Sequence, residues 1–364
     1  MEEAIQIQDL SVAAYTVPTE SPEADGTIAW DSTTMVIVRL KAGGKEGIGY
    51  TYAHAAAAQV IERTLKPIVI GQNIFDIPHL NSEMVKAIRN IGAFGIAMMA
   101  VSAVDVALWD LKAKILGVPL AALLGKARNE VLLYGSGGFT SYPISKLQEQ
   151  LSDWVESGIR HVKMKIGTQI ADDPERIKAA REAIGEHASL YIDANGAYTA
   201  KQAIDIAAKV ERFNISWFEE PVPSDNLEGL HFIRNHVPTS VNIVAGEYGY
   251  SLPYFTAMLK ANAVDILQGD ATRCGGITGF LKAGYLCESF QLPYSSHCAP
   301  ALHLHAALAL PSFYIAEYFY DHVRIEDMFF DGVVKPVDGM LSADMSLPGL
   351  GLIFKEADAE KYKV

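Results

Sequence analysis

The segments VKMKIG (residues 162–167), LYIDAN (190–195), SWFEEP (216–221) and NIVAGE (242–247) decide the fold, because each joins a short apolar run to charged residues. They belong to a series of eight such runs, which start roughly 20 to 30 residues apart, and an amphipathic stretch follows each run but the last. That spacing accommodates one strand, one crossover helix and two short loops, the repeating unit of a parallel barrel. The predicted strands are Val131–Gly135, His161–Ile166, Leu190–Ala194, Ile215–Glu219, Asn242–Ala245, Val264–Gly269, Leu292–Ser296 and Phe313–Glu317.

The two ends of the chain depart from this repeat. After the eighth run the sequence turns irregular and rich in glycine, so we expect the eighth helix to be missing or replaced. The first third shows two strands, at 34–40 and 46–52, and then helical patterns at 55–65, 77–90 and 96–116, without alternation. The predicted fold class is therefore α/β, a modified TIM barrel (β/α)7β with an N-terminal α+β capping domain.

Three segments follow from this pattern. We expect a capping domain at residues 1–128, built from a three-stranded meander and helices, and a barrel at 129–320. A C-terminal segment, 321–364, is expected to return to the cap. Residues 16–31, rich in proline, serine, glycine and acidic side chains, are expected to form a loop.

Composition narrows the classes of partner and metal. The 364 residues carry 30 Lys and Arg against 43 Asp and Glu, a net charge of −13, which disfavours nucleic acid and anionic membranes as partners. Half of the residues are hydrophobic, enough for a sizeable core, and the acidic N-terminus lacks the features of a secretory signal, so we expect a cytoplasmic protein. The three cysteines, Cys274, Cys287 and Cys298, have no zinc-ligand spacing, so any metal must have oxygen ligands.

Carboxylates gather at the ends of adjacent predicted strands, where a parallel barrel has its active site. Asp193, Glu219 and Glu247 end three consecutive strands, and their mutual repulsion would be relieved by a hard divalent cation. Oxygen ligands with open positions favour Mg²⁺, and we expect one ion per subunit. Glu220 is the alternative ligand on its strand.

Candidate proton-transfer groups end other strands of the same barrel. Lys163 and Lys165 are two residues apart and point the same way, and Lys163 together with a cation would lower the pKa of Lys165 and make it a base. His297 would lie across the barrel mouth, with Asp270 on the adjacent strand orienting its imidazole. A base beside a metal that holds a carboxylate can remove the α-proton of that acid, giving an enediolate.

The chain resembles the enolase superfamily, in particular the mandelate racemase subgroup of the mandelate racemase/muconate lactonizing enzyme family. The resemblance rests on AVDVALWDLKAK (103–114) with GVPL after it, on VKMKIG, DAN, WFEEP and GE, and on LPGLG (347–351). Asp193 and Glu219 are 26 residues apart and Glu219 and Glu247 are 28 apart, as in the family. At Arg273, mandelate racemase itself has lysine, so identity with that enzyme is not implied.

The resemblance implies a role for each matching residue. Asp193, Glu219 and Glu247 would hold the metal, Lys165 would be one base, and His297 with Asp270 would serve the opposite face. It further implies that Lys163 binds the substrate carboxylate, that Glu317 acts as an acid on it, and that Asn195 and Ser136 contact the substrate. Capping loops would cover the far end of the substrate, and among their side chains we expect Trp30 and Tyr52 to bind it.

These residues permit two reactions, β-elimination of water and racemisation or epimerisation. The capping segments are mostly polar, with Thr19, Glu20, Ser21, Glu23, Asp25, Thr51, Tyr52 and His54, which favours a sugar acid, and hence a dehydratase giving a 2-keto-3-deoxy acid. A Schiff-base aldolase using Lys163 or Lys165 and a non-catalytic carboxylate-binding barrel are the remaining alternatives. A small-molecule carboxylate is the expected partner, in a homo-oligomer.

Overall fold

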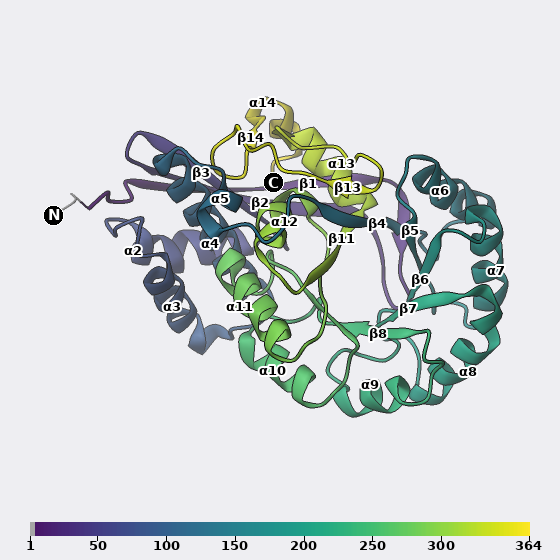
Figure 1. Ribbon diagram of the computed structural model, residues 1–364. Helices are drawn as coiled ribbons and strands as arrows, with labels where there is room; N and C mark the ends of the chain where they lie inside the picture. Colours follow the sequence, from purple (N-terminus) through teal and green to yellow (C-terminus); the bar gives the residue numbers. More distant parts are fainter. Residues whose placement is uncertain (1–3) are drawn as a thin grey trace.

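The computed structural model describes residues 4–364 and has a parallel barrel of eight strands beside an antiparallel sheet (Figure 1). Neighbouring strands pair in chain order, and the eighth strand pairs with the first, which closes the barrel. The fold class is as predicted. The barrel strands are β4 (Val131–Gly137), β5 (His161–Lys165), β6 (Ser189–Asp193), β7 (Ile215–Glu219), β8 (Asn242–Ala245), β9 (Ile266–Gly269), β10 (Tyr294–Ser296) and β11 (Phe313–Phe319).

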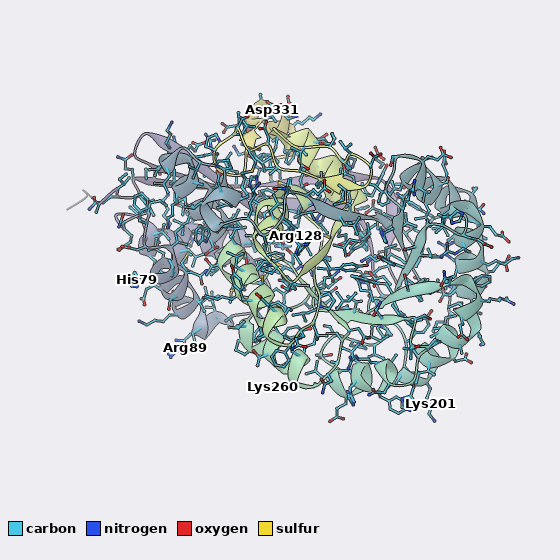
Figure 2. All side chains as sticks on the ribbon, in the orientation of Figure 1. His79, Arg89, Arg128, Lys201, Lys260 and Asp331 are labelled. Atoms are coloured by element: carbon cyan, nitrogen blue, oxygen red, sulfur yellow. The ribbon has the colours of Figure 1, made fainter. Side chains whose placement is uncertain are left out.

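Helices surround the barrel, and one helix follows each strand from β4 to β10. They cover the outward faces of the strands in one large apolar core, while their charged residues face solvent: Lys201 and Lys260 project from the outside of the ring (Figure 2). These helices are α6 (Ile144–Glu156), α7 (Asp173–Ile184), α8 (Ala200–Val210), α9 (Leu227–Arg234), α10 (Leu252–Lys260), α11 (Gly276–Ser289) and α12 (Pro300–Ala309).

A separate aromatic cluster fills the interior of the barrel. Tyr191 and Trp217 stack with ring centroids 4.9 Å apart, and Tyr134 packs against both. Because side chains alternate along a strand, residues two positions beyond Tyr191 and Trp217 also point inward. Those residues are Asp193 and Glu219, so the aromatic layer forms the floor under the polar strand ends.

The capping sheet has three antiparallel strands, β1 (Asp9–Ala24), β2 (Ala29–Ala42) and β3 (Lys45–Tyr52). Helix α4 (Ile96–Leu116) lies against β3, where a Cβ on Gly49 would come within 2.2 Å of the carbonyl oxygen of Ala103. The shorter helical segments are α1 (Ala57–Val60), the π-helical turn Ile61–Leu65, α2 (Lys66–Val69), α3 (Ile77–Ala87) and α5 (Leu120–Leu124).

The expected loop at 16–31 is wrong, because β1 and β2 continue through most of it as a hairpin. Thr16 pairs with Thr34 and Glu23 with Trp30, and the turn is closed by Asp25, whose Oδ1 accepts hydrogen bonds from the backbone N–H groups of Thr27 and Ile28. Pro18 is tolerated because β1 is an edge strand. The polar composition of residues 16–31 indicated a loop, because the pairing of β1 with β2 cannot be recognised from this segment alone.

The hairpin tip rests on the barrel mouth. A Cβ on Gly26 would lie 2.4 Å from the carbonyl oxygen of Ala194, so this close approach requires glycine. Thr140 and Thr168 both donate hydrogen bonds from their hydroxyls to the carbonyl oxygen of Asp25, at 2.8 and 2.6 Å. The capping sheet is thereby fixed over the carboxyl ends of the barrel strands.

A helix, α13 (Tyr320–Phe329), follows the eighth strand directly, so the irregular segment begins only after Phe329. The eighth helix was expected to be missing or replaced, and α13 stands at that point; it was not foreseen because its buried face carries Asp321, His322 and Glu326, which hide its apolar period. Beyond it lie β12 (Phe330–Asp331), β13 (Met340–Leu341), β14 (Ile353–Phe354) and α14 (Glu356–Ala359). The backbone N–H of Val364 donates to the carbonyl of Ala14 on β1. Within residues 4–364, no helix has the length and apolar character to cross a membrane.

Candidate active site

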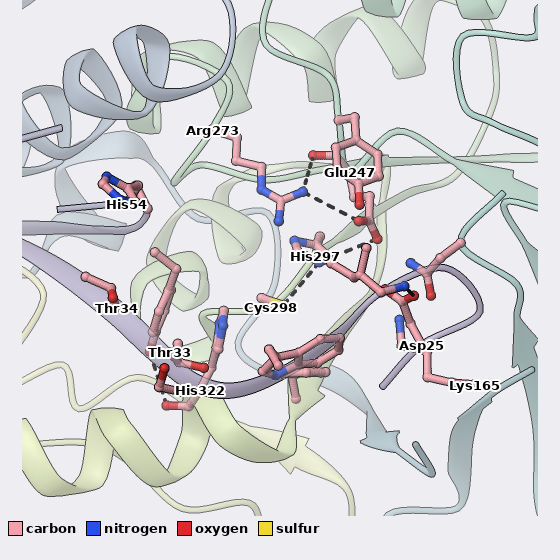
Figure 3. A pocket seen from close by; sticks show the side chains of 18 residues that line it. Asp25, Thr33, Thr34, His54, Lys165, Glu247, Arg273, His297, Cys298 and His322 are labelled. Carbon is pink, nitrogen blue, oxygen red and sulfur yellow. Dashed lines mark hydrogen bonds and ion pairs between the residues drawn. The ribbon is translucent and has the colours of Figure 1, made fainter. Parts of the chain in front are cut away.

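A cavity of about 460 Å³ lies between the carboxyl ends of the barrel strands and the capping hairpin (Figure 3). Its lining combines residues from both parts of the chain. From the barrel come Lys165, Asn195, Glu247, Tyr248, Arg273, His297, Cys298 and Phe319, and from the cap and α13 come Asp25, Ile28, Trp30, Ser32, Thr33, Thr34, Tyr52, Ala53, His54 and His322.

The three predicted metal ligands converge beside this cavity. Asp193, Glu219 and Glu247 are all buried and each offers a carboxylate oxygen within 4.8 Å of the others. Glu219 Oε2 accepts a hydrogen bond from Trp217 Nε1 at 2.9 Å, which fixes that carboxylate. The group contains Glu219 and not Glu220, whose pKa is raised well above its usual value by burial and by Glu247.

The donor set fits a hard cation such as Mg²⁺. Glu247 Oε2 is buried and has no hydrogen-bond partner among residues 4–364, and only the longer contact with His297 Nε2, at 3.5 Å, competes with its use as a ligand. Burial and the neighbouring Asp193 carboxylate raise the pKa of Glu219 to about 8, as expected for carboxylates gathered without a counter-ion. Three carboxylates with oxygen ligation and no thiol or imidazole in the set are typical of Mg²⁺.

The two lysines of β5 occupy different environments. Lys163 is fully buried, with its Nζ 2.7 Å from Glu219, 2.9 Å from Glu317 and 3.2 Å from Asp193, and it does not line the cavity. Lys165 lines the cavity and its Nζ lies 2.5 Å from Asp193 Oδ2. The binding role expected for Lys163 stays a prediction.

The lowered pKa expected for Lys165 beside a bound cation stays a prediction, and the contacts among the described residues act in the opposite direction. Burial alone would lower the pKa, as would Lys163, but the contact with the Asp193 carboxylate outweighs both and raises it above its ordinary value. This contact depends on how β5 lies against β6 and is not visible in the sequence. A cation shared by Asp193 would weaken the pairing, because both compete for the same carboxylate.

His297 and Asp270 form the expected dyad. His297 Nδ1 lies 2.8 Å from Asp270 Oδ2, and Asp270 Oδ1 accepts the backbone N–H of Thr272 at 2.7 Å. Burial opposes charge on the ring, but the Glu247 carboxylate and the hydrogen bond to Asp270 raise the pKa of His297 overall. The imidazole is therefore held in one orientation, with its protonated form favoured.

The dyad and Lys165 stand apart across the barrel mouth. His297 follows β10 and Lys165 ends β5, and these strands are separated by β11 and β4 on one side of the closed sheet. Figure 3 shows both side chains reaching the same cavity. Two proton-transfer groups can thus act on one molecule bound between them.

Glu317 and Ser136 lie below the cavity and do not line it. Glu317 Oε1 pairs with Lys163, and its Oε2 accepts the backbone N–H of Cys298 at 2.7 Å. Burial would raise the pKa of Glu317, but Lys163 and His297 lower it, so this arrangement favours the ionised form rather than the expected acid. Ser136 is fully buried on β4, level with Lys163 on β5.

The other expected contact residues are divided between the cavity and the surrounding structure. Asn195, Trp30 and Tyr52 line the cavity, together with Asp25 and His54. Of the remaining polar candidates, Thr19, Glu20, Ser21, Glu23 and Thr51 do not line it. Glu23 accepts a hydrogen bond from Trp30 Nε1 at 2.9 Å and Thr51 donates to the carbonyl of Thr272, so both support the wall from behind.

Sequence reasoning missed several lining residues, chiefly Arg273, Cys298 and His322. Arg273 lies 3.5 Å from both Glu247 Oε1 and Asp270 Oδ2. Cys298 Sγ lies 3.2 Å from His297 Nε2, and its place directly after His297 was a usable signal. His322 belongs to α13, and its ring stacks on Tyr52 with centroids 3.4 Å apart, a contact that no local pattern announces.

Two family descriptions match the chain in succession. Residues 9–125 match the mandelate racemase/muconate lactonizing enzyme N-terminal domain, and residues 146–358 match the enolase C-terminal domain-like family. Among solved structures, a mandelate racemase/muconate lactonizing enzyme-like protein from Rubrobacter xylanophilus superposes with a TM-score of 0.97 at 50% identity, covering 99% of this chain and 100% of that chain.

Dehydratases are among the curated relatives of the chain. The L-talarate/galactarate dehydratase of Salmonella typhimurium is 35% identical over 283 residues, which cover 76% of this chain and 71% of that protein. Its crystal structure with Mg and L-lyxarohydroxamate superposes with a TM-score of 0.91 at 30% identity, covering 100% of this chain and 94% of that one. The arabinonate dehydratase of Saccharolobus solfataricus is 32% identical over 346 residues, which cover 90% of this chain and 91% of that protein.

Proposed function

Because the chain belongs to the mandelate racemase/muconate lactonizing enzyme family of the enolase superfamily, we propose that it is a magnesium-dependent sugar-acid dehydratase. In the proposed reaction the α-proton of an aldonate or aldarate is removed and the β-hydroxyl leaves as water. The product is a 2-keto-3-deoxy acid. The observation that carries the proposal is the placement of Lys165 and the His297–Asp270 dyad at one cavity whose far side is rich in hydroxyl and imidazole groups.

The chain's own residues supply the proton transfers. Lys165, whose Nζ reaches the cavity, takes the α-proton in its neutral form, which becomes favoured when Asp193 is engaged in holding the ion and no longer pairs with Nζ. His297, whose protonated form is stabilised by Asp270 at Nδ1, gives a proton to the departing β-hydroxyl, which leaves as water rather than hydroxide. The capping hairpin over the barrel mouth limits access of bulk water to these steps.

Asp193, Glu219 and Glu247 would hold the magnesium ion. When bound, the ion stabilises the negative charge that develops on the carboxylate of the substrate. Relatives with 30% and 28% identity have been solved with magnesium, which supports this cofactor. Lys163, surrounded by Asp193, Glu219 and Glu317, balances the charge of the carboxylates beneath the cavity.

A panel of aldonates and aldarates, incubated with the protein and Mg²⁺ and assayed for 2-keto acid, tests the proposal. We expect at least one member to be converted, and chelation of the metal to stop the conversion. If every member stayed intact while an α-proton exchanged with D₂O, the dehydratase proposal would be wrong. That result would favour the second candidate.

The second candidate is a racemase or epimerase of a 2-hydroxy acid. It is favoured by the same separation of Lys165 and His297, because one group can remove the α-proton and the other can return one to the opposite face. A relative from Enterococcus faecalis, 30% identical over 270 residues, is a hydrophobic dipeptide epimerase. The polar far side of the cavity favours the dehydratase over this alternative.

We further propose a homo-oligomer in the cytoplasm. The exposed side chains of Ile91 and Phe94, which lie between α3 and α4, are large and apolar, as at subunit contacts. The three cysteines are free and buried, which suits a reducing compartment. Light scattering on the purified chain measures the subunit number, and a monomeric mass would contradict the first part.

A further inference from the structure

The side of the cavity farthest from the metal ligands has a chemical character of its own. We call Thr33, Thr34, His54 and His322 the distal wall. Thr33 and Thr34 come from β2, His54 follows β3, and His322 belongs to α13. Figure 3 shows these four side chains together, well separated from Lys165 and Glu247. A substrate whose carboxylate lies at the barrel end would extend toward this wall.

Thr33 can accept a hydrogen bond from the cavity but cannot donate one. Its Oγ1 donates to Asp321 Oδ2 at 2.5 Å, which uses the only hydroxyl proton. The lone pairs that remain on Oγ1 need a donor as partner. An alcohol of the substrate is such a donor, whereas a carboxylate has no proton to offer.

His322 is a buried and uncharged member of the wall. Its side chain stacks on Tyr52, and the Tyr52 hydroxyl donates to the carbonyl oxygen of His322 at 3.2 Å. Nδ1 is buried and has no hydrogen-bond partner among residues 4–364. Burial and the nearby His297 lower the pKa of His322, so the ring is neutral and carries no charge that could pair with a carboxylate.

Positive charge in the cavity is confined to the barrel end and is already balanced there. The lysine and arginine that line the cavity are Lys165, paired with Asp193, and Arg273, which lies 3.5 Å from both Glu247 and Asp270. The carboxylate of Asp25 also lines the cavity, beside Lys165 at the barrel end (Figure 3). A second carboxylate on the substrate would find no lysine or arginine at the distal wall to pair with.

We infer that the substrate ends, at the distal wall, in an uncharged hydrogen-bond-donating alcohol, and is therefore an aldonate rather than an aldarate. Thr33 and His322 are the specificity-determining residues for that end. The inference rests on the proposed function, because it takes the reacting carboxylate to lie beside Asp193, Glu219 and Glu247.

Aldonates compared with the aldarates of the same configuration test the substrate class. The pairs are D-gluconate with D-glucarate and D-galactonate with galactarate, each with the Mg²⁺-loaded protein. We expect kcat/KM, or Kd by calorimetry where a pair is not turned over, to favour the aldonate of the better pair by roughly tenfold or more. A preference for the aldonate of less than threefold overturns the inference and leaves the proposed function standing. A preference for the diacid that is lost in Arg273→Met has the same consequence. If no sugar acid is turned over or bound, both the inference and the proposed function are wrong.

The two specificity residues are tested with a substrate that lacks the terminal hydroxyl. A 6-deoxy aldonate should react about tenfold less efficiently than its parent with the unsubstituted protein, mainly through KM, because a buried acceptor loses its partner. Thr33→Val removes the hydroxyl of Thr33, and His322→Phe keeps a ring against Tyr52 without nitrogen. Each should abolish the difference between the two substrates. Thr256→Val, on the far helix α10, should keep it.

The assignment of Thr33 and His322 would be wrong if each variant lost activity equally on the 6-deoxy substrate and on its parent. That outcome would show a structural role instead. Equal unfolding temperatures of the variants and the unsubstituted chain would show that a change in activity arises in the cavity and not from a loss of stability.

Discussion

Replacing Asp270 by asparagine should impair proton transfer by His297 and leave proton transfer by Lys165 largely intact. Asp270 Oδ1 accepts the backbone N–H of Thr272 at 2.7 Å, and an asparagine carbonyl oxygen would keep that bond. The amide nitrogen must then face His297 Nδ1, where the carboxylate oxygen now lies at 2.8 Å. An amide donor at this position favours an unprotonated Nδ1, whereas the imidazolium needs a proton on both nitrogens.

The magnitude follows from these contacts. A hydrogen bond to a charged group is worth about 1.5–3 kcal/mol, and a donor facing a donor in a buried site adds about 1–3 kcal/mol. Because part of each effect is relieved by relaxation, we expect a loss of roughly 3–5 kcal/mol, which lowers kcat for elimination about 10²- to 10⁴-fold. Lys165, on β5, should retain α-proton exchange within about tenfold.

The assay measures 2-keto acid formation and α-proton exchange in D₂O with the same sugar acid and Mg²⁺. His297→Asn should give the same pattern, and the double variant should be no slower than either single variant, because the two residues act as a unit. Elimination by Asp270→Asn within threefold of the unsubstituted enzyme would refute the reasoning. So would equal loss of both reactions in a variant with unchanged unfolding temperature.

Further predictions concern the opposite base, the metal and the fold. Lys165→Met should lower elimination at least about 10³-fold while the unfolding temperature changes little, and retained turnover would remove Lys165 as the base. Removing the metal with a chelator should abolish 2-keto acid formation and added Mg²⁺ should restore it, whereas full activity of the metal-free protein would contradict the assigned ligands. Burial raises the pKa of Glu326 from 4.5 to about 8, so between these values the folded state binds a proton that the unfolded chain has released. The free energy of unfolding should therefore fall as pH rises from about 5 to 8, by at most about 5 kcal/mol. In chemical denaturation, Glu326→Gln should show a weaker dependence of this free energy on pH. Gly246→Ala should lower the free energy of unfolding by about 1–3 kcal/mol, measured by thermal unfolding, because a Cβ there would lie 2.0 Å from the carbonyl oxygen of Gln268. Gly44 also has a positive φ but open space around it, so Gly44→Ala should lower the free energy of unfolding by less.

The sequence predicted best what depends on local alternation. Asp193, Glu219 and Glu247 could be placed together because each ends a short strand and parallel strands end at one edge of the barrel. The dyad of His297 and Asp270 followed from the same rule. In these elements the pattern along the chain and the fold agree, so no distant contact was needed to interpret them.

What the sequence could not predict depends on contacts between distant segments. The hairpin within 16–31 exists because polar residues of β1 find partners on β2, and composition alone indicated a loop. His322 reaches the cavity because Tyr52, from the capping sheet, packs on it. The contact that raises the pKa of Lys165, with Asp193 at 2.5 Å, could not be predicted either, because it depends on the register of β5 against β6.

The most direct test of the central claim is proton NMR of a single aldonate turned over by the Mg²⁺-loaded protein in D₂O. The account predicts loss of the α-proton signal together with formation of a 2-keto-3-deoxy acid that carries one deuterium at C3. An aldonate that binds at the site and keeps its α-proton unexchanged, with no 2-keto acid formed from any sugar acid tested, would contradict the account.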